Sequence, residues 1–295
     1  MSTNSRLNHA FRHALTLPLC ANSKYVLISD CHRGAGNSSD NLLKNQHLYF
    51  AALKHYYQKG FSYIELGDGD ELWENRCIKD IIEIHSNIFW LFSLFYREKR
   101  LYMIYGNHDI VKQKTNYSRK NLSSYFCTDR QCEMPLLPDI TFYEGILLCP
   151  VKNPNEPIYL THGHQASTLN STLWPLSRFL VRYLWHPLEN FGIQDPTSAA
   201  KNYSVKTNCE KRLSQWAEEN HRILITGHTH RPVLPEEPSY YYNTGSCVHP
   251  RCITCIEIEN YSLTLVKWTM STKADNTLYV AREVLSGPVS IYNGI

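Results

Sequence analysis

A short apolar run that ends in a glycine-flanked aspartate constrains this chain more than any other single feature. Residues 63–66 predict a buried strand, and Gly67-Asp68-Gly69 follows immediately. Open α/β sheets gather functional residues at the carboxyl ends of their strands, and glycine lets a ligand approach the backbone closely. We therefore expect Asp68 to face a charged ligand, and a pair of metal ions is the favoured candidate.

Four further apolar runs end in polar residues in the same way. The residues that follow them are Asp30 and His32 after residues 25–29, Asn107, His108 and Asp109 after residues 101–105, His162 and His164 after residues 158–160, and His228 and His230 after residues 222–225. Residues two apart in an extended chain face the same side, so Asp30 and His32 can bind one ion together. One shared site is the simplest explanation of five such clusters.

The periodicity between these runs predicts an α/β fold in a single domain over residues 1–295. Helical spacing predicts helices over residues 41–58 and, as one long buried helix, over residues 77–100. Residues 111–138 are expected to form a loop-rich excursion, residues 140–142 and 146–149 a hairpin, and the last residues a tail along the surface. Residues 167–220, with helical periodicity over 175–186 and 199–219, are expected to form an inserted helical cap.

Composition limits the classes of function and location. The formal net charge of +3 over 295 residues, with both signs mixed along the chain, does not indicate a general nucleic-acid or membrane surface. The ten cysteines follow no disulfide or zinc-site pattern and are expected to be reduced, which makes the cytoplasm the expected location. We expect no signal peptide and no transmembrane segment, although a lipid substrate would bring peripheral membrane contact.

The residue types at the five strand ends favour divalent metals. Imidazole nitrogen and carboxylate oxygen suit Mn²⁺, Fe²⁺ and Zn²⁺, and two ions about 3.5 to 4 Å apart need a carboxylate that reaches both. Two such ions neutralise a phosphate and acidify a water that attacks phosphorus. The expected cofactors are two divalent metal ions, with Mn²⁺ favoured, and the expected partner is a small phosphate-containing substrate.

The five clusters resemble the ordered blocks of the calcineurin-like metallophosphoesterase superfamily. Those blocks are Asp-x-His, Gly-Asp, Gly-Asn-His-Asp/Glu, a lone His and Gly-His-x-His, and all five occur here in order between Asp30 and His230. The resemblance implies a four-layer double-ψ β-sandwich flanked by helices. It implies that one ion is bound by Asp30, His32 and His230, that the other is bound by Asn107, His162 and His228, and that Asp68 bridges them. It also implies that His108 is the catalytic histidine and that Asp109 orients its ring.

Within the superfamily the chain looks most similar to the UDP-2,3-diacylglucosamine pyrophosphohydrolases. The similar features are Gly-Asp-x-x-Glu-x-Trp at residues 67–73, Gly-His-Thr-His-Arg-Pro at residues 227–232 and a helical insertion before the latter. Those hydrolases typically carry Gly-Asn-Arg-Asp and His-Gly-Asp, where this chain has His108 and His164. The resemblance therefore implies phosphoester chemistry and leaves the substrate open.

Several charged residues beside the blocks are candidates for substrate binding. Arg33 follows a predicted metal ligand, Arg178 and Arg182 share a helix face, and His164 lies in the fourth cluster. Asp70 and Glu71 either orient the ligands or form a solvated turn. The leading hypothesis is hydrolysis of a phosphodiester or a nucleotide-diphosphate-linked substrate, and the alternatives are a nuclease, a phosphomonoesterase and a non-catalytic scaffold. A nuclease would need a long basic groove, which the near-neutral charge does not indicate, so no specific nucleic-acid partner is expected.

Overall fold

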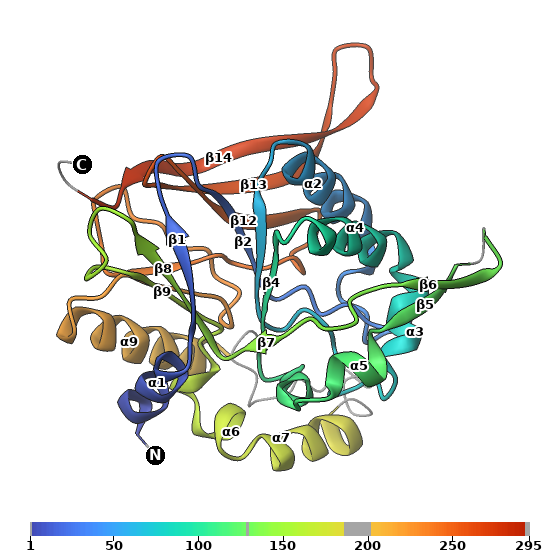
Figure 1. Cartoon of the computed structure of the whole chain (residues 1–295), viewed down its shortest axis with the longest axis horizontal. Helices are drawn as coiled ribbons and strands as arrows, with labels where there is room; N and C mark the ends of the chain where they lie inside the picture. Colours follow the sequence, from blue (N-terminus) through green and yellow to red (C-terminus); the bar gives the residue numbers. More distant parts are fainter. Residues whose placement is uncertain (1, 128–129, 186–201, 293–295) are drawn as a thin grey trace.

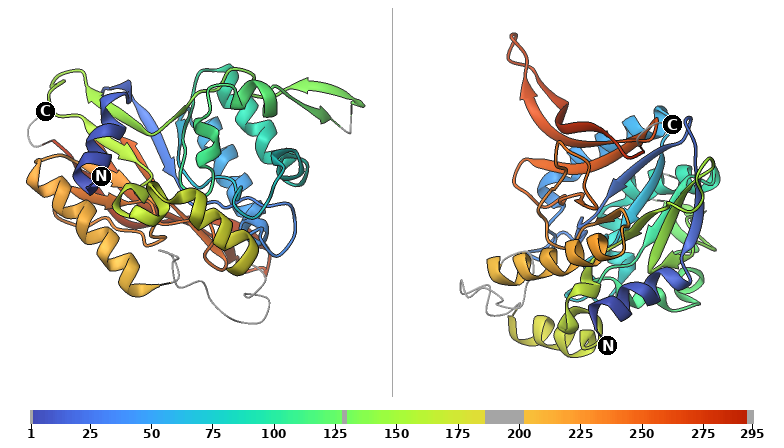
Figure 2. Two further views of the ribbon diagram at one scale, coloured as in Figure 1. Left: turned by 90° about the horizontal axis from the view of Figure 1, so that it is seen from below. Right: turned by 90° about the vertical axis from the view of Figure 1, so that its left-hand side faces the viewer.

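The computed structural model describes residues 2–127, 130–185 and 202–292. Within them, two large sheets lie face to face, and helices cover their outer faces (Figures 1 and 2). The larger sheet has the strand order β14 (Leu278–Ser290), β13 (Ser262–Thr272), β12 (Cys252–Glu259), β2 (Lys24–Ile28), β3 (Ser62–Leu66), β4 (Leu101–Ile104) and β7 (Phe142–Tyr143). The smaller sheet has the order β1 (Leu15–Leu19), β8 (Gly145–Pro150), β9 (Ile158–Thr161), β10 (Leu224–Thr226) and β11 (Tyr241–Asn243).

The central strands are apolar on both faces because both faces are buried. In β2, Leu27 packs into the core between the sheets, and Val26 and Ile28 pack outward against the helices. The outer layer on this side consists of α2 (Gln46–Gln58), α3 (Ile78–Ile84) and α4 (Ser86–Arg97). On the smaller sheet, α1 (Thr3–Arg12) and α9 (Tyr203–Glu219) form the opposite layer. The predicted four-layer α/β sandwich is confirmed.

The remaining helices and strands are short and lie around the sandwich. They are η1 (Leu43–Asn45), η2 (Ile110–Gln113), α5 (Tyr117–Asn121), the hairpin of β5 (Ser124–Cys127) and β6 (Cys132–Pro135), η3 (His164–Ala166), α6 (Thr168–Ser171), α7 (Trp174–Leu180) and the π-helix η4 (Val181–Trp185). No helix of the described residues combines the length and apolar character that crossing a bilayer requires.

Several boundaries differ from the sequence-based expectations. The helix expected over residues 77–100 is two helices, because the His85 side chain turns inward to Asp40, at 2.9 Å, where α3 ends. The hairpin expected over residues 140–149 does not form, since β7 pairs with β4 in one sheet and β8 pairs with β1 and β9 in the other. The expected C-terminal tail contains the long edge strand β14, which pairs antiparallel with β13.

The expected cap over residues 167–220 has two parts of different character. Its second half, α9, buries Leu213 and Trp216 in the core with Phe11 of α1, and therefore covers the smaller sheet. Its first half, α6, α7 and η4, has exposed apolar side chains such as Leu176 and Phe179. Residues 186–201 lie outside the described residues, so a single cap over 167–220 stays a prediction.

Candidate metal centre

The five polar clusters meet at one edge of the sandwich. Strands β2, β3 and β4 run parallel, as do β9 and β10, and each delivers its cluster at its carboxyl end. The backbones of these loops are hydrogen-bonded to one another, with Asp30 N donating to Gly67 O at 3.1 Å and Gly227 N donating to His162 O at 3.0 Å. Side chains join them further, because Asp68 Oδ1 accepts from His108 N at 2.8 Å and Asp30 Oδ2 accepts from His228 N at 2.9 Å.

The backbone of these loops is held in an unusual conformation. Asp30, His32, Asp68, His228 and His230 all have φ between 47° and 68°, in the left-handed region. Residues with a Cβ atom rarely adopt this conformation, because it costs about 1–3 kcal/mol of conformational free energy for each residue. Such strained residues cluster at functional sites. The strain aims five side chains into one small volume. Glycine is required at Gly106, where a Cβ atom would lie 2.2 Å from Asp68 Oδ1.

Three groups of possible metal ligands result. Their members are Asp30, His32 and His230; Asp68, His162 and His228; and His32, Glu71 and His108, with the ligand atoms of each group within 4.8 Å of one another. The Asp68 carboxylate lies between the first two groups, because its Oδ2 is 3.1 Å from His162 Nε2 and 3.8 Å from His32 Nε2.

Buried atoms without partners show that the first two groups fit cations. Asp30 Oδ1, His32 Nε2, Asn107 Oδ1 and His162 Nε2 are buried and make no hydrogen bond to the described residues, although Asp30 Oδ1 lies 3.1 Å from His230 Nε2 and His162 Nε2 lies 3.1 Å from Asp68 Oδ2. Buried polar atoms in proteins are normally satisfied, and an ion is one reason for an exception. The two rings are also oriented from behind, since His162 Nδ1 bonds Leu66 O and His32 Nδ1 bonds Glu71, both at 2.8 Å. Metal-binding histidines typically have such a partner on the second ring nitrogen.

The negative charges around the His32 and His162 rings favour the binding of a cation. Burial opposes protonation of His32, yet the hydrogen bond and the charge of Glu71 raise its pKa to about 10. Burial likewise opposes protonation of His162, and Asp68 raises its pKa to about 9. A divalent ion at either ring must therefore displace a proton.

Glu71 has a larger role than the sequence indicated. Its carboxylate holds the Nδ1 atoms of both His32 and His108 at 2.8 Å. The ring of Trp73 stacks on His108, with ring centroids 4.3 Å apart. The expectation that Asp109 orients His108 is corrected, because the Asp109 carboxylate accepts from Gly106 N and Lys112 Nζ instead, at 2.7 and 2.6 Å. The Glu at residue 71 in Gly-Asp-x-x-Glu-x-Trp was the available signal.

Arg33 does not reach a substrate, which corrects another expectation. Its guanidinium is fully buried and donates to Glu65 at 2.7 Å and to Asp70 at 2.6 Å. Asp70 is also 2.7 Å from Lys112 Nζ, which in turn bonds Asp109. Asp70 is therefore not part of a solvated turn, and these buried ion pairs brace the loops after β2, β3 and β4.

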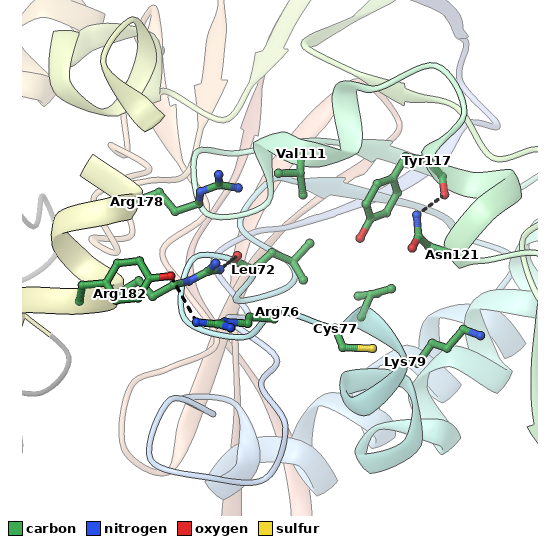
Figure 3. Close-up of a pocket in the computed structure, with 11 residues that line it drawn as sticks. Leu72, Arg76, Cys77, Lys79, Val111, Tyr117, Asn121, Arg178 and Arg182 are labelled. Carbon is green, nitrogen blue, oxygen red and sulfur yellow. Dashed lines mark hydrogen bonds between the residues drawn. The ribbon is translucent and has the colours of Figure 1, made fainter. Parts of the chain in front are cut away.

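The other expected substrate contacts differ in their surroundings. His164 is buried beside His162, with ring centroids 5.5 Å apart, and burial and the neighbouring histidines hold its pKa well below its usual range. Arg182 donates to the main-chain oxygens of Trp73 and Leu72, at 2.6 and 3.0 Å, and it also lines a pocket. Contact of Arg182 with a phosphate stays a prediction. Arg178 makes no such main-chain bond to the described residues and lines the same pocket, of about 540 Å³ (Figure 3). Contact of His164 and Arg178 with substrate stays a prediction.

The chain was compared with family models, curated proteins and solved structures. The family model described as calcineurin-like phosphoesterase matches residues 23–232, which include every cluster above. No curated protein matches the sequence. Among solved structures, the crystal structure of Vps29 from Chaetomium thermophilum is similar at 12% sequence identity and a TM-score of 0.38, over 89% of this chain and 95% of that chain.

Proposed function

Because the chain belongs to the calcineurin-like phosphoesterase family, we propose that it hydrolyses a phosphodiester or a nucleotide-diphosphate-linked substrate with two divalent metal ions. Metal-dependent phosphoester chemistry is what the family supports. The observation that carries the two-ion proposal is the convergence of buried ligand atoms without a hydrogen bond on either side of Asp68.

The proposed ligand assignment follows the two groups. Asp30, His32 and His230 bind one ion, Asn107, His162 and His228 bind the other, and Asp68 bridges them. The short distances from Asp68 Oδ2 to an imidazole of each group support the bridge. Mixed nitrogen and oxygen ligands suit Mn²⁺, which we favour, as well as Fe²⁺ and Zn²⁺. When bound, the two ions neutralise the phosphate and lower the pKa of a water molecule to make it a nucleophile.

The chain itself supplies a positioned proton donor. Glu71 holds His108 Nδ1 and Trp73 packs on the ring, so the imidazole can turn only its Nε2 edge to a substrate. Burial opposes the charged form of His108, and the nearby Glu71 and Asp68 carboxylates raise its pKa. A protonated His108 can donate to the leaving oxygen or stabilise charge on the phosphoryl oxygens.

The alternative functions are separated by specific features. A non-catalytic scaffold of this family predicts that ligand residues are missing, but all seven proposed ligands are present. A nuclease needs an extended basic surface, which a net charge of +3 does not favour. A phosphomonoesterase would use the same centre, and only the choice of substrate separates it from a phosphodiesterase.

The test combines metal content with a substrate panel. Protein purified without chelator should contain close to two divalent ions per chain by elemental analysis, with Mn²⁺ restoring activity after EDTA treatment. Bis(p-nitrophenyl) phosphate or a UDP-sugar should be hydrolysed faster than p-nitrophenyl phosphate. Absence of bound metal together with no turnover in excess Mn²⁺ would exclude the proposal, and a preference for the monoester would establish the phosphomonoesterase alternative.

A further inference from the structure

The pocket of about 540 Å³ is separate from the candidate metal centre, since its lining includes none of the proposed metal ligands. Its walls come from the segment before α3, from η2 and α5, and from α7 and η4 (Figure 3). Two lining residues connect it to the centre, because Leu72 directly follows Glu71 and Val111 lies three residues after His108. The volume is in the range of sites for small organic ligands, about 300–1,000 Å³.

One end of this pocket is strongly basic. Figure 3 shows the guanidinium groups of Arg76, Arg178 and Arg182 gathered there, and none of the described lining residues is acidic. The crowding has an electrostatic cost, since burial and then the charge of Arg178 lower the pKa of Arg182, with a further contribution from Arg76. Three neighbouring cations with no acidic partner among the described residues favour an anionic ligand.

The guanidinium groups of the three arginines make different contacts. Arg182 fixes the pocket wall, because its guanidinium binds the main-chain oxygens of the Leu72–Trp73 segment. The guanidinium of Arg178 lies over the ring of Trp174, 5.1 Å from the ring centroid, which holds it in place by a cation–π contact. Arg76 donates to the Tyr183 hydroxyl at 3.2 Å, and the other N–H groups of its guanidinium make no hydrogen bond to the described residues.

The rest of the pocket lining is of mixed character. Val111, Ile78 and Tyr117 line it together with Cys77, Lys79 and Asn121, and Figure 3 shows the Tyr117 ring on the side opposite Arg76 and Arg182. A guest that fills both ends must combine an anionic group with an apolar or aromatic part.

We propose that this pocket selects the substrate by binding a second phosphate group through Arg76 and Arg178, with an apolar or aromatic part of the same molecule against Val111 and Tyr117. This inference rests on the proposed function, since the first phosphate occupies the metal centre. Arginine suits the role because its planar guanidinium can bind phosphate oxygens in pairs. The substrate class is then a diester or diphosphate with a second phosphate, in preference to a simple monoester.

Binding of UDP to EDTA-treated protein tests the pocket without any catalysis. The variant Arg76→Gln with Arg178→Gln should weaken UDP binding by isothermal titration calorimetry at least about tenfold, or about 1.4 kcal/mol. The matched control is Lys44→Gln with Lys54→Gln, which removes the same charge from exposed positions outside the pocket lining. Equal binding by wild type and the arginine variant, or equal weakening in the lysine control, would overturn the inference.

Turnover with Mn²⁺ separates this inference from the proposed function. For the arginine variant, the ratio of kcat/KM for UDP-glucose to that for bis(p-nitrophenyl) phosphate should fall about tenfold. An unchanged ratio would overturn the inference while leaving the phosphoesterase proposal in place. If no substrate is hydrolysed but the arginine variant alone loses UDP binding, the proposed function fails and the anion site stands. Melting temperatures of all variants verify that each is folded.

Discussion

The Asp68 carboxylate is the residue on which the metal centre depends most. Its Oδ2 atom lies between the imidazole groups of His32 and His162, and its Oδ1 atom accepts a hydrogen bond from the His108 amide. A bridging carboxylate offsets the repulsion between two cations that share a site. Neutralising it should therefore affect the metals before it affects the fold.

We expect Asp68→Asn to reduce bound metal to one ion or none and to abolish turnover, because the amide cannot supply the bridging charge. Elemental analysis and hydrolysis of bis(p-nitrophenyl) phosphate provide the measurements. The matched control is Asp139→Asn, an exposed carboxylate paired with Arg119, which should leave both unchanged. Two retained ions with more than about a tenth of the activity would show that Asp68 does not bridge.

His108 is expected to affect the rate and not the metal content. His108→Ala should lower kcat by about 10² to 10⁴ with metal occupancy close to that of wild type. The loss should be smaller for p-nitrophenyl than for alkyl leaving groups if the ring protonates the leaving oxygen. Glu71→Gln should produce part of the same loss, since it releases His108 Nδ1. Unchanged rates with both types of ester would remove His108 from the site.

At the scale of elements, buried ion pairs hold the strand-end loops together. Arg33, Glu65, Asp70, Lys112 and Asp109 form a chain of contacts that joins the loops after β2, β3 and β4. Breaking a buried pair leaves an uncompensated charge, which costs more than an exposed pair contributes. The arrangement keeps the loops in their strained conformation while the sheet itself is held by apolar packing.

Removing the central cation should therefore destabilise the whole domain. We expect Arg33→Met to lower the free energy of unfolding by about 3–5 kcal/mol, because Glu65 loses its guanidinium partner and Asp70 keeps only Lys112. Denaturant titration measures the free energy of unfolding of the variant and of wild type. Arg119→Met removes an exposed arginine and should change stability by less than about 0.5 kcal/mol. A loss below about 1 kcal/mol in Arg33→Met would contradict the bracing role.

For the whole molecule, metal binding and folding are linked. The proposed ligands come from both sheets, so an ion bound there connects the two halves of the sandwich in the folded state only. Mn²⁺ at about 100 times its dissociation constant should add about 2.7 kcal/mol, or roughly 5 °C in Tm. Because the pKa values of His32 and His162 are raised, protons compete with the metal, and the gain should be smaller at about pH 6 than at about pH 8.

Differential scanning fluorimetry of EDTA-treated protein, with and without Mn²⁺, measures that shift. Asp68→Asn serves as the control and should show a smaller shift at both pH values. An equal shift in the variant would place the stabilising metal outside the proposed centre.

The residue pattern of the sequence by itself determined the α/β class and the positions of the strand-end clusters, and the resemblance of those clusters to a family implied the sandwich. A buried strand needs a continuous apolar run, and the polar residues directly after it lie at its carboxyl end whatever the rest of the chain does. Asp30, Asp68 and His162 could therefore be placed at one edge from local pattern alone, and the order of the five blocks indicated the family.

Only the tertiary structure decided what those side chains and their neighbours contact. Arg33 was expected at a phosphate and is buried against Glu65, and the ring of His108 is held by Glu71 in place of Asp109. The pairing of β7 and β8 with different sheets was equally invisible in the sequence. The physical reason is common to these cases: a charged or polar group settles with whichever distant partner the packed sheets bring within hydrogen-bond reach, and residue spacing carries no information about that partner.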